Sequence, residues 1–371
     1  MRQGVEIGMN GDILFDVRNN VGYITLNRPA KLNALSYPVI KILYEKLLEW
    51  KKDDNVALLV IRGAGEKAFC AGGDVRHLYD KRNEDVVEYG FGFFYTEYCM
   101  NLTMHTYPKP ILAYMNGIVM GGGVGVGVAA THRIVTEKTK WSMPEMNIGL
   151  YPDVGGSYFL NKMPTYMGRY LALTSCIIRG ADVLYTEGAD YYMESSKWDD
   201  LIYEIENGKW EIDSAKDTLD NILESLLKNK PEGCELEKIE DKIKRHFDFE
   251  SMEEIVESLK SDSDKWAKAT LENILSKSPT SLKVTLKQLV DGSKKNLSEC
   301  FEMELDMSMN FLTCHDFFEG VRSVLVDKDR NPTWNPSSLE EIDKDYVDKF
   351  FSYEWENNKN PLKDFLSRQL V

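Results

Sequence analysis

Two carboxylates, Glu145 and Asp153, lie eight residues apart in a segment that prolines and glycines interrupt. Proline and glycine disfavour a continuous helix, so this spacing indicates a folded loop and not one helix face. A carboxylate in such a loop can attack a carbonyl carbon or activate a water molecule. About twenty residues earlier, the glycines Gly121–Gly123 can expose backbone N–H groups that hold an oxyanion. Acids and amides placed in this way are typical of acyl chemistry.

Both acids also have a purely structural interpretation. They could be surface carboxylates, and Asp153 could cap a helix that begins near Gly155. Their neighbours in the chain are mostly apolar, namely Met143, Met146, Ile148, Leu150, Tyr151 and Val154. If these neighbours bury the two acids, a functional role is the better interpretation.

A second group of small residues forms the sequence Phe69-Cys70-Ala71-Gly72-Gly73-Asp74, after an expected strand at Ala57–Ile61. Small residues let a ligand approach the backbone, and Asp74 can cap a following helix. The alternative is an ordinary turn from a strand into a helix. The glycines from Gly121 to Gly127 likewise either open a helix with accessible N–H groups or allow close helix packing.

Other signatures of chemistry are weak or missing. The strict G-x-G-x-x-G spacing of dinucleotide sites is absent, and no Gly-Lys-Ser/Thr follows the glycines as in a P-loop. The five histidines show no metal-ligand spacing, and no G-x-S-x-G serine motif occurs. We therefore expect neither a metal site nor a serine triad.

Composition limits the classes of function. The chain has 371 residues, 43% of them hydrophobic, and a net charge of −15. This size and composition indicate a globular protein with a large core, and the charge argues against nucleic acid or an anionic membrane as partner. Six cysteines lie far apart without a C-x-x-C pair, which favours buried thiols in a reducing compartment. No apolar run is long enough to span a bilayer.

The periodicity predicts an α/β fold whose second half is mainly helical. Expected strands are Ile13–Val17 and Val21–Leu26 as a hairpin, then Ala57–Ile61, Ile111–Met115 and Arg133–Thr136. Expected helices are Tyr37–Trp50, Ser214–Lys228, Ser263–Lys277 and Leu297–Met309. We place the boundary between a core, residues 1–200, and a helical C-terminal region, residues 201–371, near residue 200.

Taken together, these segments resemble the crotonase (enoyl-CoA hydratase/isomerase) superfamily. The elements that carry the resemblance are Leu26–Pro29 with Leu32–Leu35, then Phe69–Asp74, Gly121–Gly123 and Met143–Glu145. The resemblance implies a crotonase-like spiral of ββα turns. It also implies that the amides of Gly73 and Gly122 form an oxyanion hole for a CoA thioester, and that Ala71, Gly72 and Asp74 line the adenine pocket.

Within the superfamily the chain looks most like the 3-hydroxyisobutyryl-CoA hydrolases. That family carries M-P-E followed by G-L-[FY]-P-D-V-G-G, which Glu145 and Asp153 match. The likeness continues through Ser278–Lys283, His315–Arg322, Asp327–Asp329, Pro332 and Trp334. A further matching segment, Phe93–Tyr98, makes Glu97 a candidate contact to the acyl group, the alternative being a solvated helix face.

One departure from the hydratases separates the two related activities. Hydratases use a second glutamate three residues after the middle glycine of the cluster, and that position is Gly125 here. Hydratases also tend to have glycine where this chain has Asp153. The two acids therefore stand at other sequence positions than in the hydratases, so the resemblance favours hydrolysis over hydration.

The resemblance implies hydrolysis of 3-hydroxyisobutyryl-CoA, or another short hydroxyacyl-CoA, in valine breakdown. The alternatives are a hydratase or isomerase, or a non-catalytic scaffold protein of the same fold. No cofactor is expected, since CoA is part of the substrate. Basic candidates for the CoA phosphates are Arg28, Lys31, Lys283 and Lys287. The family implies the mitochondrial matrix, with the cytoplasm as alternative because no clear presequence is visible, and it allows a homo-oligomer.

Overall fold

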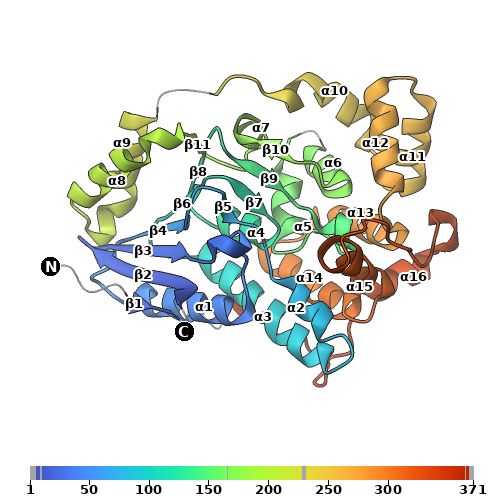
Figure 1. Ribbon diagram of the computed structural model, residues 1–371, viewed down its shortest axis with the longest axis horizontal. Coiled ribbons are helices and arrows are strands. Elements are labelled where there is room, and N and C mark those ends of the chain that lie inside the picture. Colours follow the sequence, from blue (N-terminus) through green and yellow to red (C-terminus); the bar gives the residue numbers. More distant parts are fainter. Residues whose placement is uncertain (1–5, 9–10, 165, 228–230, 364, 367–371) are drawn as a thin grey trace. The chain divides into compact units, whose positions relative to one another are not determined.

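The computed structural model describes residues 6–8, 11–164, 166–227, 231–363 and 365–366 (Figure 1). Residues 1–5, on which the expectation about a presequence bears, lie outside this set. The chain forms two compact units that alternate along the sequence. Unit 1 contains Met1–Gly73, Cys99–Trp141 and Ile177–Glu235, and unit 2 contains Asp74–Tyr98, Ser142–Cys176 and Leu236–Val371. The proposed division near residue 200 stays a prediction.

Unit 1 contains a seven-stranded sheet with the strand order β1-β2-β3-β4-β6-β8-β11. The strands β2 and β3 form the expected antiparallel hairpin, joined by Asn19 and Asn20 with φ of 48° and 60°. Two positive φ angles match the twist of a hairpin, and asparagine tolerates them. From β3 to β11 all pairs are parallel. The bounds are β1 Glu6–Ile7, β2 Ile13–Arg18, β3 Val21–Leu26, β4 Leu58–Gly63, β6 Ile111–Met115, β8 His132–Val135 and β11 Tyr191–Tyr192.

A second sheet has four short strands in the order β10-β9-β7-β5. The strands β5 (Ala68–Cys70) and β7 (Ile118–Met120) are parallel neighbours, with Ala68 opposite Ile118. Both therefore end at the same edge of the sheet, where the chain continues into the two glycine segments. The other two strands are β9, Lys140–Ser142, and β10, Ile178–Arg179.

Helices of unit 1 pack by the apolar faces that the sequence predicts. Helix α1 (Tyr37–Lys51) buries Val39, Ile40, Leu43 and Leu47, which recur at helical spacing. Helices α8 and α9 contribute to one core with the larger sheet. The remaining elements are η2 Pro29–Lys31, α4 Gly122–Val128, α7 Gly180–Tyr185, η5 Ser195–Lys197, α8 Trp198–Asn207, η6 Ile212–Ser214 and α9 Ala215–Leu226.

Unit 2 is built from helices, and every regular element described after residue 200 is helical, as expected. Helix α3 (Val86–His105) gives its residues up to Tyr98 to unit 2 and the rest to unit 1. The others are α2 Val75–Asp80, η3 Glu145–Ile148, α5 Gly156–Phe159, η4 Leu160–Lys162, α6 Met167–Thr174, α10 Glu235–Phe247, α11 Met252–Ser261, α12 Lys265–Leu275, α13 Pro279–Gly292, α14 Leu297–Phe311, α15 His315–Val321, η7 Arg322–Val326, η8 Leu339–Glu341, α16 Lys344–Asp348 and η9 Lys349–Phe351.

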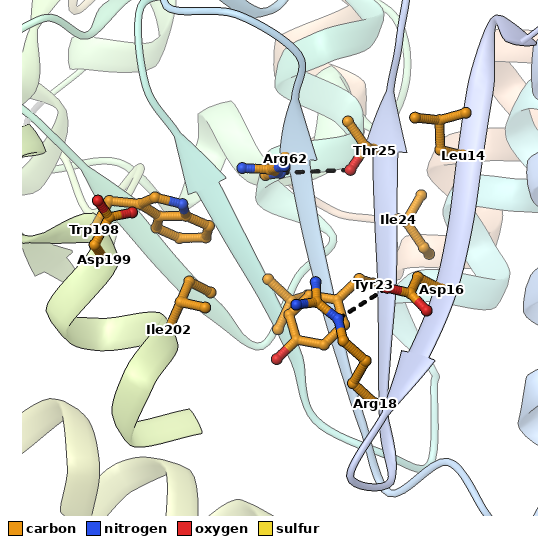
Figure 2. Close-up of a pocket in the computed structure, with 11 residues that line it drawn as sticks. Leu14, Asp16, Arg18, Tyr23, Ile24, Thr25, Arg62, Trp198, Asp199 and Ile202 are labelled. Atoms are coloured by element: carbon orange, nitrogen blue, oxygen red, sulfur yellow. Dashed lines mark hydrogen bonds and ion pairs between the residues drawn. The ribbon is translucent and has the colours of Figure 1, made fainter. Parts of the chain in front are cut away.

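A pocket in unit 1 lies between the strands β2 to β4 and helix α8 (Figure 2). Arg18 pairs with Asp16 there at 2.8 Å, and its guanidinium lies 4.3 Å from the centre of the Tyr23 ring. None of the residues that line this pocket is a predicted site residue. Within the described ranges, no helix has the length and apolarity needed to cross a bilayer.

The close packing of helix α4 against strand β5 can be tested at Gly123. A Cβ on Gly123 would lie 2.3 Å from the carbonyl oxygen of Cys70, which is backbone and cannot yield easily. We expect Gly123→Ala to lower the free energy of unfolding by about 1–3 kcal/mol, as overpacking does, in urea titrations. Glu257→Ala on α11 (Met252–Ser261) is the control, because that side chain is exposed. If both variants lost the same free energy of unfolding, the close approach of Gly123 to the Cys70 carbonyl would be contradicted.

Candidate active site

In unit 1 the two glycine segments come together beyond the parallel strands β5 and β7. A Cβ on Gly72 would lie 3.0 Å from the carbonyl oxygen of Met120 and 3.4 Å from the amide nitrogen of Gly122. Gly72 also has a φ of +103°, which disfavours other residues. Glycine is therefore required at this position for the two backbones to approach one another.

Two backbone N–H groups of these segments point away from the hydrogen bonds between the neighbouring stretches of chain. The Leu35 N–H donates to the Gly72 carbonyl at 2.8 Å in a parallel bridge of Leu35 with Gly73. In this register the N–H of Gly73 itself faces away from Leu35. Gly122 is the first residue of α4, whose leading N–H groups have no partner within the helix. The expected oxyanion-hole residues thus lie in adjoining segments of one unit, and their role stays a prediction.

Three carboxyls are buried in unit 2, where an ordinary acid would be exposed. Glu97 on α3 is 2% exposed, Glu145 at the start of η3 is 5% exposed and Asp153 before α5 is 6% exposed. The solvated helix face for Glu97 and the surface loop for the other two are therefore wrong. Asp153 does not cap α5 with its side chain. Its Oδ2 instead accepts a hydrogen bond from the Tyr98 hydroxyl at 3.0 Å.

Burial shifts the pKa values of all three acids upward, and repulsion adds to the rise for Glu97 and Glu145. Burial raises the pKa of Asp153 to about 6, and the hydrogen bond from Tyr98 opposes the rise. Burial and the charge of Asp153 raise the pKa of Glu97 and of Glu145 well above their usual range. Carboxyls close together cannot all ionise, so the cluster holds protons at a pH where free acids have lost them.

Asp153 lies on a strained loop that two buried side chains hold. Val154, a β-branched residue, has a φ of 51°, and Gly155 has a φ of 89°. Such a conformation at valine persists only where the surroundings impose it. Gln288 on α13 donates to the Pro152 carbonyl at 2.6 Å.

On the other side of this loop, the carboxylate of Glu304 on α14 accepts three hydrogen bonds. They come from the Gly155 N–H at 2.7 Å, the Ser157 N–H at 2.8 Å and the Ser157 hydroxyl at 2.6 Å. Burial raises the pKa of Glu304 to about 8, and the three donors oppose the rise. Sequence reasoning missed Glu304, because an acid in a helix rich in charged residues gives no sign of burial. Its flanking Met303 and Leu305 were the only hint.

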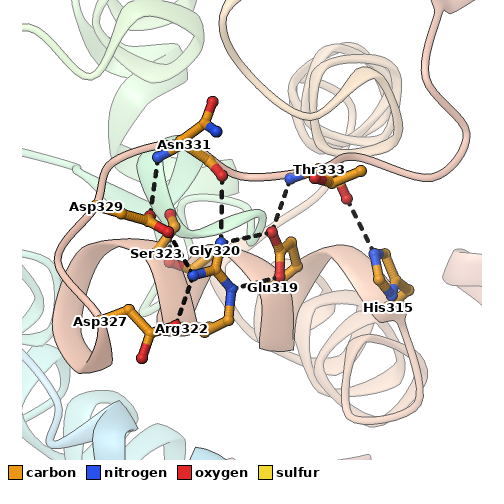
Figure 3. Close-up of polar contacts among 9 residues, drawn as sticks. All are labelled: His315, Glu319, Gly320, Arg322, Ser323, Asp327, Asp329, Asn331 and Thr333. Carbon is orange, nitrogen blue, oxygen red and sulfur yellow. Dashed lines mark hydrogen bonds and ion pairs between the residues drawn. The ribbon is translucent and has the colours of Figure 1, made fainter.

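The segment that carries Glu145 packs against α15 backbone to backbone. A Cβ on Gly149 would lie 2.2 Å from the Asp316 carbonyl oxygen, and one on Gly320 would lie 2.2 Å from the Ile148 carbonyl carbon. Arg322 holds the chain after α15 by pairing with Glu319, Asp327 and Asp329 (Figure 3). The C-terminal residues that resemble the hydrolases thus support the position of Glu145.

The expected phosphate ligands divide into two kinds. Lys283 pairs with Glu253 at 2.6 Å, and Lys287 pairs with Asp291 at 2.7 Å, so their charges are neutralised within unit 2. In unit 1 Arg28 donates to the Ala34 carbonyl and lies 3.4 Å from Asp12, and Lys31 is exposed. Lys31 is therefore the better candidate for a phosphate.

Asp74 precedes helix α2, as expected, although its side chain makes no capping hydrogen bond. Ala71 is fixed by its N–H, which donates to the Leu32 carbonyl at 3.0 Å. The adenine role of Ala71, Gly72 and Asp74 stays a prediction.

Comparison with known proteins identifies the family. Residues 21–351 match the model of the enoyl-CoA hydratase/isomerase family. A protein from Danio rerio named 3-hydroxyisobutyryl-CoA hydrolase, mitochondrial, is 42% identical over 342 residues, covering 92% of this chain and 89% of the relative. A Neurospora crassa protein named small ribosomal subunit protein mS47 is 39% identical over 350 residues, covering 89% of this chain and 69% of that protein.

A solved structure shows the same fold. The crystal structure of an enoyl-CoA hydratase from Rhodobacter sphaeroides superposes with a TM-score of 0.84 at 34% identity, covering 92% of this chain and 97% of that one. The expectation of a crotonase-like fold is confirmed.

The raised pKa values predict how stability depends on pH. An acid whose pKa is higher in the folded than in the unfolded protein stabilises the fold at low pH, and this contribution is lost as pH rises through the folded pKa. Stability should fall from about pH 4 through pH 6 for Asp153 and onward to pH 8 for Glu304. At pH 8 we expect the double variant Glu97→Gln, Glu145→Gln to have a free energy of unfolding about 1–3 kcal/mol higher than that of the native chain, measured by urea titration.

The two proteins should differ less at pH 5, where the native acids are protonated. Glu257→Gln on α11 is the control, because that side chain is exposed. A double variant that is less stable than the native chain at pH 8 would show that the two acids do not strain the fold.

Proposed function

Because this chain belongs to the enoyl-CoA hydratase/isomerase family, we propose that it hydrolyses the thioester of a short hydroxyacyl-CoA. The first candidate substrate is 3-hydroxyisobutyryl-CoA, which gives 3-hydroxyisobutyrate and free CoA. The observation that carries this proposal is the buried carboxyl cluster with Glu145 and Asp153, while Gly125 stands where hydratases place their second glutamate. The name of the Danio rerio relative supports the same substrate.

In the proposed reaction the N–H groups of Gly73 and Gly122 bind the thioester carbonyl oxygen. Each well-aimed donor contributes about 3 kcal/mol to the tetrahedral intermediate. Glu145 attacks the carbonyl carbon to form a mixed anhydride, or it takes a proton from the attacking water. The carbon–sulfur bond breaks, and the thiolate of CoA takes up a proton. In the first route water then cleaves the anhydride, which releases the hydroxy acid and frees Glu145.

The remaining residues recognise the substrate. Asp153 orients the hydroxyl of the acyl chain or the water, and Glu97 contacts the acyl group. Ala71, Gly72 and Asp74 line the adenine pocket, and Lys31 meets a phosphate. The reaction needs no group beyond the CoA that the substrate itself carries.

A place in valine breakdown and in the mitochondrial matrix follows from the same proposal. The relatives from Danio rerio and Homo sapiens are named mitochondrial. Association of this chain with further copies of itself is also a prediction, which sedimentation velocity checks.

A second candidate function has one observation in its favour. The Neurospora crassa relative is named as a ribosomal subunit protein, and it is nearly as similar to this chain as the hydrolase is. A scaffold role does not need carboxyls, yet this chain keeps Glu97, Glu145 and Asp153 buried in one cluster. Catalysis is therefore the better interpretation.

Thiol release from 3-hydroxyisobutyryl-CoA tests the main proposal. We expect the native chain to release CoA, and Glu145→Gln and Asp153→Asn each to lower kcat/KM by about 10²–10⁴-fold, as loss of an acid or base does. Glu257→Gln should leave the rate unchanged. Circular dichroism and CoA binding, measured by calorimetry, show that the variants are folded. A native chain that binds CoA but releases none from any short hydroxyacyl-CoA would favour the scaffold role.

Crotonyl-CoA separates hydrolysis from hydration. Gly125 supplies no second acid, so we expect no measurable hydration, followed as loss of the enoyl absorbance. Hydration faster than thiol release from the hydroxyacyl-CoA would overturn the choice of hydrolase over hydratase.

A further inference from the structure

Asp153 lies at the end of a buried row of three hydroxyl groups in unit 2. Tyr98 donates to Asp153 Oδ2 at 3.0 Å, and its oxygen lies 2.7 Å from the Ser308 hydroxyl. Ser308 in turn lies 2.7 Å from the Tyr151 hydroxyl. Tyr151 donates to the main-chain carbonyl of Glu304. All three side chains are fully buried, so no bulk water competes for these hydrogen bonds.

The chemistry of the two ends gives this row a direction. A carbonyl oxygen only accepts, so the single proton of Tyr151 is committed to Glu304. The proton of Ser308 then goes to the oxygen of Tyr98 or Tyr151. The proton of Tyr98 can go to Ser308 at 2.7 Å, to Tyr151 at 3.4 Å or to Asp153 at 3.0 Å, and an ionised carboxylate is the strongest acceptor of the three. Tyr98 is therefore free to donate to Asp153, and hydroxyls in such a row polarise one another.

Among the described residues, no hydroxyl donates to the other two acids of the cluster, although the backbone N–H of Glu145 favours ionisation of that side chain. Glu97 Oε1 and Glu145 Oε2 are buried and have no hydrogen-bond partner among the described residues. A hydrogen bond to the charged form of an acid favours ionisation, whereas burial and a neighbouring charge disfavour it. Because of this difference in partners, Asp153 ionises more readily than Glu97 and Glu145.

We propose that the hydroxyl row of Tyr98, Ser308 and Tyr151 places the negative charge of the cluster on Asp153 and leaves Glu97 and Glu145 protonated in the resting protein. Tyr98 is a positioning residue in this scheme. The electrostatic effects among the titratable groups around the three acids agree with this charge distribution. Asp153 has the smaller pKa rise, to about 6, and its charge raises the pKa of Glu97, Glu145, Tyr98, Tyr151 and Glu304.

The charge distribution has a consequence for the proposed function, on which this part of the inference rests. A protonated Glu145 can act neither as nucleophile nor as base until it has lost its proton. The ionised carboxylate of the cluster is Asp153, so the proton passes from Glu145 to Asp153 and the total charge is unchanged. Asp153 thereby activates Glu145, and protonated Glu97 donates a hydrogen bond to the acyl group.

Infrared spectroscopy tests the charge distribution without any reaction. A protonated carboxyl has a carbonyl band that a carboxylate lacks, and ¹³C-labelled aspartate or glutamate assigns the band to a residue type. At pH 7 we expect Glu97→Gln and Glu145→Gln each to lose part of the glutamic acid band. In Tyr98→Phe a protonated aspartic acid band should appear that is absent from the native chain. Tyr107→Phe is the matched control, because that buried hydroxyl donates to the Leu47 carbonyl in unit 1.

Unchanged glutamic acid bands in Glu97→Gln and Glu145→Gln would overturn the proposal. So would a native aspartic acid band at pH 7 that Asp153→Asn removes. If Tyr98→Phe does not fold, Ser308→Ala removes the hydroxyl behind Tyr98 and should raise the same aspartic acid band. Because these spectra need no substrate, they stand even if the chain hydrolyses no thioester.

The pH profile of thiol release gives a second readout. Loss of the Tyr98 hydroxyl raises the pKa of Asp153, so the acid limb of kcat/KM in Tyr98→Phe should move to higher pH by about one unit. We expect about a fivefold loss at pH 6 and less than about a twofold loss at pH 8. An equal loss at every pH would mean that Tyr98 only supports the fold.

Discussion

The cost of keeping carboxyls away from water governs the architecture of unit 2. An isolated carboxylate in an apolar interior is strongly disfavoured, and three together cannot all ionise. Glu97, Glu145 and Asp153 are nevertheless buried. The surrounding helices supply a hydroxyl for Asp153 from α3 and a fourth buried carboxyl, that of Glu304, which fixes the loop. Helices α13 and α14 therefore hold the loop that carries Asp153.

The glycine segments of unit 1 meet a different requirement at much lower cost. Backbone N–H groups carry no net charge, so exposing two of them needs only a conformation in which no ladder or helix uses them. Parallel strands provide it, because β5 and β7 end at the same edge and lead into Gly72 and Gly121. The fold itself thus provides the donors, whereas the acids need dedicated partners.

This difference explains what the sequence could predict. The hairpin, helix α1 and the α/β class followed from local periodicity and turn residues, and the acids and glycines followed from short motifs. The residues that hold Asp153 and its loop could not be predicted from such motifs. Tyr98 and Ser308 are 210 residues apart, and Gly155 and Glu304 are 149 apart, so no local pattern connects them. The same limit affected the lysines, since only the folded chain shows that Lys283 and Lys287 are already paired.

The interleaving of the two units was also beyond local patterns, because it depends on which helices pack together and not on where helices occur. The arrangement around Asp153 nevertheless bears on whether such a chain is an enzyme. A left-handed valine costs on the order of 1–3 kcal/mol, and buried acids that resist ionisation lower stability further at neutral pH. A scaffold gains nothing from either feature, since apolar residues would pack the same space. Strain at Val154 beside three buried acids is the pattern expected where chemistry, and not stability, determines the residues.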